Sequence, residues 1–369
     1  MPVIDSEQRE AMRESFERLL AHRCDEAELR RIIAMQDGHD AALWRDMARI
    51  GLLTALVPEE HGGIGGGAQE IEILMEEAGK VLLPGPFLSS AVLATAALTE
   101  SGDAAAKARL LPALADGSLI GTVAIAGEQG LWDGHDGDVA AAGGGENATL
   151  SGVAGYVSDG AVAGLLLVVA GRGADRRLFE VTDRAGLTVT PLEGFDITQR
   201  LTRIAFADVK AREIAGGDAA AIDRMIDIAR IALAGRQAGA ARRNFDITVD
   251  YLRTRIQFGR PIGGFQAIKH MAADLLIERE SAISGARAAA EAHAGGKGNA
   301  AEIVAMASFA VGEAQVKIAF DALQMHGGIG FTWEHPCHLY LRRAWHDSKF
   351  LGSHDLARDH FLSILEKQA

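Results

Sequence analysis

The stretch TRIQFGRPIGGFQAIKHMAAD, residues 254–274, carries the strongest local signal in the chain. Basic residues flank the aromatic–glycine pair near its start: Arg253, Arg255 and Arg260. Pro261 breaks any regular element, because proline lacks a backbone N–H, and an amphipathic helical pattern follows it. Guanidinium groups bind phosphate oxygens in a bidentate fork, so an arginine cluster at this junction suits a phosphate diester. The simpler interpretation of the stretch alone is a solvated, charged helix end.

Helical patterns lie on both sides of this junction. They cover residues 219–253, 264–294, 299–325, 336–348 and 354–367. Ala and Gly are abundant in them, as in ARIALAGRQAGAARR, and small side chains at facing positions let long helices approach closely. We therefore expect a C-terminal four-helix bundle over residues 216–369.

Residues 119–215 differ in composition and pattern from the helical segments that follow them. Short runs rich in β-branched residues, such as ATLSGVAGYVS, AGLLLVVAG and LTRIAFADV, alternate with Gly, Asp and Asn. No helix of about 10–15 residues separates these runs, so we expect a central antiparallel β domain and not a βαβ array. AAGGGENATLSG, residues 141–152, has the composition of a hairpin connection.

The first 118 residues are helical in pattern. SEQREAMRESFERLL, DAALWRDMARIGLL and QEIEILMEEAGKVLL place apolar residues at i, i+3, i+4 and i+7. Breaks fall at PEEHGGIGGG (58–67) and LLPGPFL (82–88). The sequence thus predicts an α+β fold with a helical domain at 1–118, a β domain at 119–215 and a helical bundle at 216–369.

Composition limits the possible partners. The 369 residues can bury a large core, and the net charge is −13 without a block of basic residues. That field would repel nucleic acid and anionic lipid, so we expect neither as a partner. The N-terminus lacks a signal-peptide pattern, and the longest apolar run, at 164–171, is too short for a bilayer. Cys24 and Cys337 form no disulfide framework, and we expect a soluble cytoplasmic protein.

Three weaker patterns have simple explanations. GGIGGG (62–67) does not open a βαβ unit, which favours a flexible loop between helices. His335, His338 and His346 surround Cys337 without a standard metal-ligand spacing, so we expect no metal. Ser158 and Ser353 lack the context of a serine hydrolase nucleophile.

The segment LQMHGGIGFTWEHP, residues 323–336, is a second strong signal. Its double glycine allows the backbone to approach a planar or phosphorylated ligand. A helix C-cap is the alternative interpretation, although it explains one glycine more easily than the whole GGIGF run.

Four stretches together resemble the acyl-CoA dehydrogenase family of flavoproteins. They are LWRDMARIGLLTALVPEEHGGIG (43–65), YVSDG (156–160), RIQFGRPIGGFQAIKHMAAD (255–274) and LQMHGGIGFTWEHP (323–336). The resemblance covers nearly the whole chain. It implies an N-terminal helical domain, a β-barrel-like middle domain and a four-helix bundle, usually in a tetramer. FAD would lie between the β domain and the bundle, with its adenosine end reaching the neighbouring subunit.

The resemblance also assigns site residues. Beside the isoalloxazine ring it places Tyr156, Val157 and Ser158. Contacting the FAD pyrophosphate across the subunit interface it places Arg255, Gln257 and Phe258, and at a further FAD contact Phe265 and Gln266. In the segment that accepts the partner subunit's FAD it places Gln324, Met325, His326, Gly327 and Gly328. At the adenosine end it places Ser353, His354 and Asp355, and near the CoA moiety Asp227 and Arg230.

Such a site implies α,β-dehydrogenation of an acyl-CoA thioester. A base removes the pro-R α-proton while the β-hydrogen leaves as hydride to flavin N5, and hydrogen bonds to the thioester carbonyl stabilise the enolate. Electrons then pass to an electron-transfer flavoprotein.

Two departures from the family pattern matter. The catalytic glutamate falls on Leu351, and the alternative position of that glutamate falls on Ala229. Neither side chain accepts a proton, although Leu351 keeps the backbone N–H that the family uses to bond the thioester carbonyl. In AIAGEQG (124–130), Gly127 also lacks the hydroxyl that the family directs to the flavin.

Four interpretations of the missing glutamate remain open. The base is another residue nearby in sequence: His346, Asp347, His354 or Asp355. The chain is instead one subunit of a heteromeric dehydrogenase, such as those acting on bulky steroid-derived CoA esters, and its partner carries the base. It is a same-fold flavin monooxygenase, or it is a catalytically silent subunit. The assembly is then a homotetramer or a heterotetramer with a homologous chain, and we favour the second.

Overall fold

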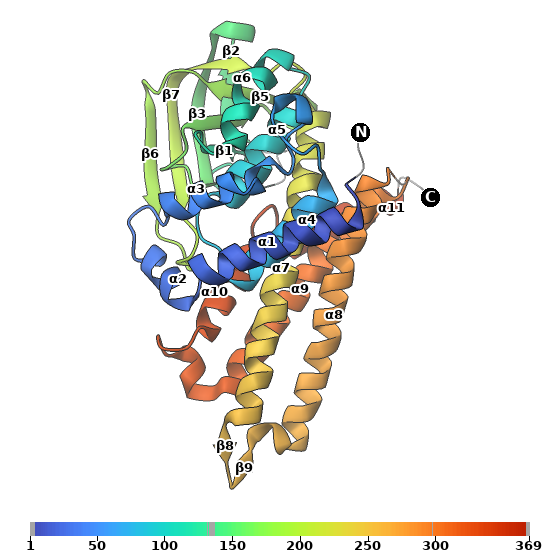
Figure 1. Cartoon of the computed structure of the whole chain (residues 1–369). Helices are drawn as coiled ribbons and strands as arrows, with labels where there is room; N and C mark the ends of the chain where they lie inside the picture. The colour runs from blue at the N-terminus through green and yellow to red at the C-terminus, as the bar shows by residue number, and fades with distance from the viewer. Residues whose placement is uncertain (1–3, 131, 133–136, 297, 367–369) are drawn as a thin grey trace.

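The computed structural model describes residues 4–130, 132, 137–296 and 298–366. Figure 1 shows the strands gathered at one end of the molecule and the long C-terminal helices extending away from them. The N-terminal helices α1 and α4 cross the junction between these two parts.

The N-terminal part is helical, as predicted, but contains more helices than the amphipathic patterns indicate. Its elements are α1 (Ser6–Arg23), α2 (Glu26–Ile33), α3 (Ala41–Arg49), α4 (Ala68–Lys80), a π-helical segment (Phe87–Ala94), α5 (Thr95–Thr99) and α6 (Ala104–Ala115). Every residue from Phe87 to Leu98 is buried, so that segment has no polar face and gives no amphipathic period. Aspartates at the N-caps of α1, α2, α3 and α6 accept backbone N–H groups of the first turn.

The central part is a seven-stranded sheet. Its strands are β1 (Gly121–Ala124), β2 (Val139–Ala142), β3 (Ala148–Ser158), β4 (Leu165–Ala170), β5 (Arg177–Val181), β6 (Leu187–Leu192) and β7 (Leu201–Glu213). The order is β1-β4-β5-β7-β3-β2, and β6 also pairs with β7. The β2–β3 hairpin lies where its composition predicts it.

The prediction of a wholly antiparallel sheet is wrong at one pair. β1 and β4 are parallel, with Gly121 opposite Leu165 and Ala124 opposite Val168. The absence of an intervening helix does not exclude parallel pairing, because here the chain between the two strands passes through the β2–β3 hairpin. All other pairs in this sheet are antiparallel.

The C-terminal part is a helical bundle with ends close to those predicted. Its elements are α7 (Ala219–Thr254), β8 (Ile256–Gln257), β9 (Arg260–Pro261), α8 (Gln266–Ala294), α9 (Ala300–His326), α10 (Cys337–Asp347) and α11 (His354–Glu366). Small residues do allow close approach: a side chain at Gly235 or Gly239 of α7 would overlap backbone carbonyls of α4. The predicted domain limits at 118/119 and 215/216 fall in the connections from α6 to β1 and from β7 to α7.

One segment of the described chain, Ala300–Phe331, is long and apolar enough to cross a membrane by length and composition alone. Half of its apolar window is buried inside the structure, where α9 packs against α7 and α8. The core helix of a bundle has the same properties, so packing accounts for this segment.

Candidate active site

Leu351 lies in the turn between α10 and α11, at the position that the resemblance assigns to the catalytic base. It is buried, and its φ of 59° is in the left-handed region that a residue with a side chain rarely adopts. Such a conformation costs roughly 1–2 kcal/mol. Gly352 follows with a φ of 108°, which glycine tolerates. The turn is thus tightly bent, and the bend occurs at Leu351 itself.

A cavity of about 290 Å³ opens beside Leu351. Its walls come from α7, α9 and α11, and residues lining it include Asp227, Arg230, Leu351, Leu356 and Ile364. The structure therefore brings the two residues predicted to lie near CoA next to the turn. Arg230 Nη1 donates to Asp227 Oδ1 at 3.4 Å, while burial raises the pKa of the Asp227 carboxyl.

The alternative position of the catalytic glutamate is close to the same place. Ala229 of α7 is fully buried, and it belongs to the same apolar cluster as Leu351. Neither position offers a carboxylate.

Aromatic side chains pack beside the turn. The rings of Trp132 and Phe350 are 4.4 Å apart between centroids, tilted by 49°, and both are buried. Phe350 also stacks on His346 at 5.5 Å. Trp132 is not among the predicted site residues, because only its place in a glycine-rich stretch of sequence distinguishes it.

The four alternative bases differ in their surroundings. Burial lowers the pKa of His346 to about 4, so its imidazole is neutral at pH 7. Asp347 is an ion-pair partner of Arg236, at 2.6 Å. Asp347 and His354 both line a very small void beside Leu351, of about 10 Å³. Asp355 is exposed and pairs with Arg358 at 3.7 Å.

The residues predicted at the adenosine end of FAD lie around the start of α11. Ser353 Oγ accepts the backbone N–H of Leu356 at 3.3 Å. His354 points into its own bundle, close enough to Gly312 of α9 that a side chain there would overlap the imidazole. Burial also lowers the pKa of His354.

The predicted flavin-side residues lie at the end of β3. The register of β3 against β7 shifts between Ala154 and Val157, and Tyr156 has a φ of 54°. As a result Tyr156 is 39% exposed whereas Val157 and Ser158 are buried. A side chain at Gly130 would lie 2.9 Å from the Tyr156 ring, so the loop after β1 passes directly over this tyrosine.

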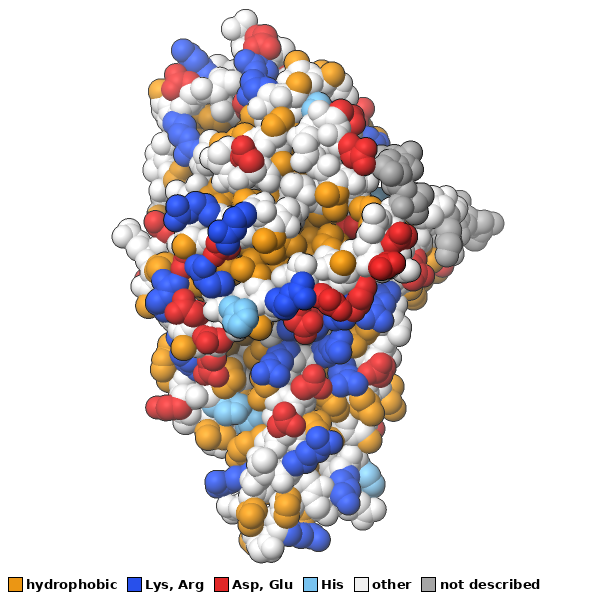
Figure 2. Space-filling model, viewed as in Figure 1, with side chains coloured by type: hydrophobic (Ala, Val, Ile, Leu, Met, Phe, Trp, Pro, Cys, Tyr) orange, Lys and Arg blue, Asp and Glu red, His pale blue; other side chains and the backbone are white. Residues whose placement is uncertain are grey.

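The predicted interface residues lie at the opposite end of the bundle. Arg255, Gln257 and Phe258 form or flank the β8–β9 hairpin at its tip, and Phe258 is 92% exposed (Figure 1). Phe265 packs edge-on against Phe258 at 6.1 Å, just before Gln266 opens α8. Figure 2 shows apolar side chains beside basic ones at this tip. Within one chain the β8–β9 hairpin therefore lies at the opposite end of the molecule from the strands.

The GGIGF segment follows α9 as a short 3₁₀ helix, Gly327–Phe331. A Cβ at Gly327 or Gly328 would meet nothing within 4 Å, so the backbone faces open space. Gln324 is exposed, whereas the side chains of Met325 and His326 are buried. The glycines, Gln324 and the hairpin therefore fit a cofactor that approaches from outside this chain.

Comparison with known proteins agrees with this architecture. Two family models match: the acyl-CoA dehydrogenase N-terminal domain over residues 6–118 and the acyl-CoA dehydrogenase C-terminal domain over 205–363. Acyl-CoA dehydrogenase IpdE2 of Mycobacterium tuberculosis is 34% identical over 352 residues, covering 94% of each chain. Acyl-CoA dehydrogenase FadE34 of the same organism is 36% identical over 85% of this chain and 41% of its own length.

Solved structures give the same result. The ChsE4–ChsE5 complex from Mycobacterium tuberculosis superposes with a TM-score of 0.89 at 28% identity, covering 99% of both chains. A Tcur3481–Tcur3483 steroid acyl-CoA dehydrogenase superposes with a TM-score of 0.90 at 29% identity, covering 98% of both. Fold and site thus define an oxidoreductase of the class that acts on acyl-CoA thioesters. The chain belongs to the acyl-CoA dehydrogenase family, whose members generally bind FAD.

Proposed function

We propose that this chain is one subunit of a heteromeric, FAD-dependent acyl-CoA dehydrogenase, in which a homologous partner chain supplies the carboxylate that removes the α-proton. The observation that carries the proposal is Leu351. Leu351 lies where the resemblance places the catalytic base, and it lines a cavity together with Asp227 and Arg230. Neither the Leu351 side chain nor the Ala229 side chain can accept a proton.

The chain retains groups for binding and polarising a thioester. The backbone N–H of Leu351 has no hydrogen-bond partner among the described residues, so it is free to donate to the thioester carbonyl. A hydrogen bond to that oxygen stabilises the negative charge that develops when the α-proton leaves. Arg230, at the cavity wall, is the cation available to the CoA phosphates.

The same chain would hold FAD in two places. Tyr156, Val157 and Ser158 would lie beside the ring of its own cofactor, and the hairpin with the GGIGF segment would complete the partner's site. When bound, FAD supplies the acceptor for the hydride that leaves the β-carbon. The α-proton would go to the partner's carboxylate as the Cα–Cβ double bond forms, and an electron-transfer flavoprotein would be the electron acceptor.

The names of similar proteins support a bulky substrate. The Tcur3481–Tcur3483 enzyme is described as a steroid acyl-CoA dehydrogenase, and ChsE4–ChsE5 is a complex of two chains. We extend both properties to this chain, with a steroid-type CoA ester as substrate and an assembly with a homologous chain, which we propose is a heterotetramer. We also propose the cytoplasm as its location.

A base within this chain is the less favoured alternative. Asp347 and His354 lie beside Leu351, but the Asp347 carboxylate is held by Arg236 at 2.6 Å and is not free to approach a substrate. One observation favours a subunit without catalytic activity: the rings of Trp132 and Phe350 pack together beside the turn that contains Leu351.

Anaerobic titration separates these alternatives. The purified chain, loaded with FAD, is titrated with medium-chain and steroid-type acyl-CoA esters while flavin absorbance is followed. We expect bound FAD, no bleaching by the chain alone, and bleaching after assembly with a homologous chain that has glutamate at the Leu351 position. Prompt bleaching by the pure chain would contradict a partner-supplied base. A colourless preparation that cannot be reconstituted would contradict the FAD assignment.

A further inference from the structure

Three possible metal ligands lie together where α9 ends and α10 begins: His326, His335 and Cys337. One ligand atom of each residue lies within 4.8 Å of the others. We propose that this cluster binds a zinc ion through two imidazole nitrogens and one thiolate. The inference does not depend on the proposed function.

His326 has the arrangement of a metal ligand. Its Nδ1 lies 2.7 Å from the backbone carbonyl of Ala322, which accepts a hydrogen bond from that nitrogen and fixes the ring proton there. The lone pair is then on Nε2, which is buried and has no hydrogen-bond partner. Metal-bound histidines usually donate their second nitrogen to a carbonyl or carboxylate in this way.

The loop between the two helices places His335 beside His326. Their ring centroids are 4.5 Å apart, and Tyr251 stacks on the His326 ring, also at 4.5 Å. His335 Nδ1 accepts the backbone N–H of Cys337 at 3.2 Å, which ties the histidine to the first turn of α10. Ligation through this nitrogen would replace that hydrogen bond with a metal bond.

Cys337 supplies the third ligand. It is the first residue of α10, its side chain is fully buried, and it forms no disulfide. Burial raises the pKa of the thiol to about 12, so the group is protonated without a metal. Binding of Zn²⁺ displaces this proton to solvent and forms a Zn–S bond, and the nearby helix N-terminus favours the thiolate.

The donor set selects the ion. Imidazole and thiolate suit zinc, whereas Mg²⁺ and Ca²⁺ take oxygen ligands. Three protein ligands leave a fourth tetrahedral position for water. The metal would join the two ends of the connection that contains the GGIGF segment, since His326 precedes Gly327 and Cys337 begins α10.

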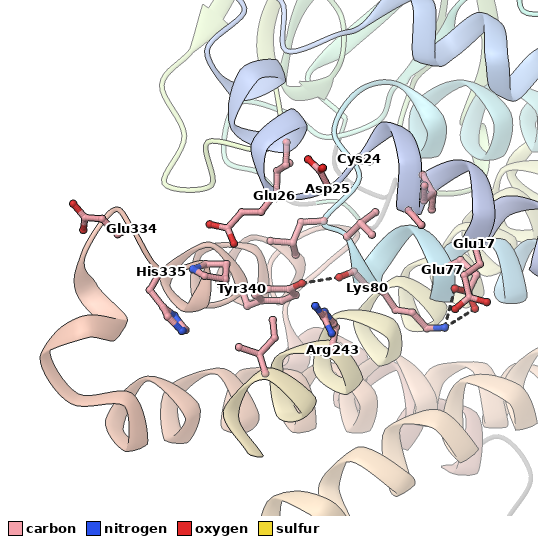
Figure 3. A pocket seen from close by; sticks show the side chains of 17 residues that line it. Glu17, Cys24, Asp25, Glu26, Glu77, Lys80, Arg243, Glu334, His335 and Tyr340 are labelled. Atoms are coloured by element: carbon pink, nitrogen blue, oxygen red, sulfur yellow. Dashed lines mark hydrogen bonds and ion pairs between the residues drawn. The ribbon is translucent and has the colours of Figure 1, made fainter. Parts of the chain in front are cut away.

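A cation can reach the cluster from a large cavity. His335 lies at the edge of a space of about 750 Å³ between α1, α2, α4, α7 and α10, which Figure 3 shows. The carboxylates lining it are Glu17, Asp25, Glu26, Glu77 and Glu334, against only Lys80 and Arg243 among the lining Lys and Arg side chains. This excess of negative charge would attract a divalent cation toward the cluster.

The test uses the full chain, stripped with a chelator, reloaded with Zn²⁺ under reducing conditions and desalted. We expect one zinc per chain by elemental analysis, and with Co²⁺ as a probe a thiolate-to-cobalt charge-transfer band. Cys337→Ser and His326→Gln should lose both signals. Cys24→Ser is the matched control, because Cys24 is the other buried cysteine and lines the same cavity. It should keep both.

Folding is checked separately by circular dichroism and by thermal unfolding without metal. Zinc should raise the melting temperature of the wild type and of Cys24→Ser, and leave that of Cys337→Ser unchanged. Substoichiometric zinc in the folded wild type would overturn the proposal. A cobalt band that survives in Cys337→Ser, or disappears in Cys24→Ser, would overturn it as well.

Discussion

Arg236 of α7 donates from Nη2 to Asp347 Oδ1 at 2.6 Å, and both side chains are buried. Asp347 is the last residue of α10, four positions before Leu351. A second buried pair, Arg343 with Asp196 at 2.8 Å, ties the same helix to the chain before β7. The turn at the predicted catalytic position is therefore anchored by charges inside the protein.

Removing one member of the first pair should destabilise the fold strongly. Asp347→Ala leaves Arg236 buried without its carboxylate, and breaking such a pair costs about 3–5 kcal/mol. Chemical denaturation with a far-ultraviolet probe measures the loss. The control is Asp250→Ala, because the Asp250–Arg253 pair is 3.9 Å long and exposed. We expect a change below about 0.5 kcal/mol there. Equal losses of stability in the two variants would show that the buried pair contributes no more than the exposed one.

The open space around Gly328 should be required for FAD binding but not for folding. In this chain a Cβ at Gly328 meets nothing within 4 Å, and its φ is not in the left-handed region. Gly328→Val should therefore leave the melting temperature of the apo chain nearly unchanged while weakening FAD binding in the assembled protein by tenfold or more, about 1.4 kcal/mol. Fluorescence titration with FAD gives the affinity.

The matched control for that variant is Gly298→Val, which also has open space around its Cβ but lies in the connection between α8 and α9. It should bind FAD as the wild type does. Unchanged FAD affinity in Gly328→Val would place the cofactor elsewhere.

Glu72 of α4 should make stability depend on pH. Burial, with a smaller contribution from Glu76, raises the pKa of its carboxyl to about 8 from 4.5. Between pH 4.5 and about pH 8 the Glu72 carboxyl is therefore protonated in the folded state and ionised in the unfolded state. Stability therefore falls as pH rises from about 4.5 through about 8.

Glu72→Gln removes this titration. Relative to the wild type, the variant should gain stability between pH 6 and pH 9, on the order of 2 kcal/mol. Urea denaturation midpoints at the two pH values give the difference. Glu14→Gln, at an exposed position, should show no such trend. A constant difference between Glu72→Gln and wild type at both pH values would mean that Glu72 titrates normally.

Much of the fold is predictable because its signals are local. The span of α7 was predicted to within one residue at its C-terminal end, since a 36-residue helix repeats its pattern many times. The segment from Phe87 to Thr99 was not predicted as helix, because burial on all sides removes the period. The parallel β1–β4 pair was missed because it depends on how a hairpin is routed and not on either strand.

The site is less predictable, because its contacts join distant parts of the chain. Leu351, Asp227 and Arg230 were assigned by resemblance, and the structure places them around one cavity. Trp132 and Phe350 meet across more than two hundred residues, and no local pattern indicates that contact.

The histidines around Cys337 show the same limitation. His338 packs on Trp333 and His346 on Phe350, while His326, which comes from the preceding helix, joins the cysteine. Spacing rules therefore could not predict this cluster, since its three residues come from a helix end, a loop and the next helix.

Restoring the carboxylate should restore proton abstraction. In Leu351→Glu the new side chain lines the cavity that contains Asp227 and Arg230, and the backbone already tolerates a side chain at this φ. Burial would raise the pKa of the new carboxyl toward neutrality, which suits a general base. The FAD-loaded chain alone should then bleach its flavin with an acyl-CoA substrate roughly 10²–10⁴ times faster than the wild-type chain. Leu351→Gln has the same shape without a base and should stay at the wild-type rate. If Leu351→Glu is no faster than Leu351→Gln while both bind FAD and the CoA ester, then the missing base is not what limits this chain, and the packing of Trp132 against Phe350 beside the turn becomes the better explanation.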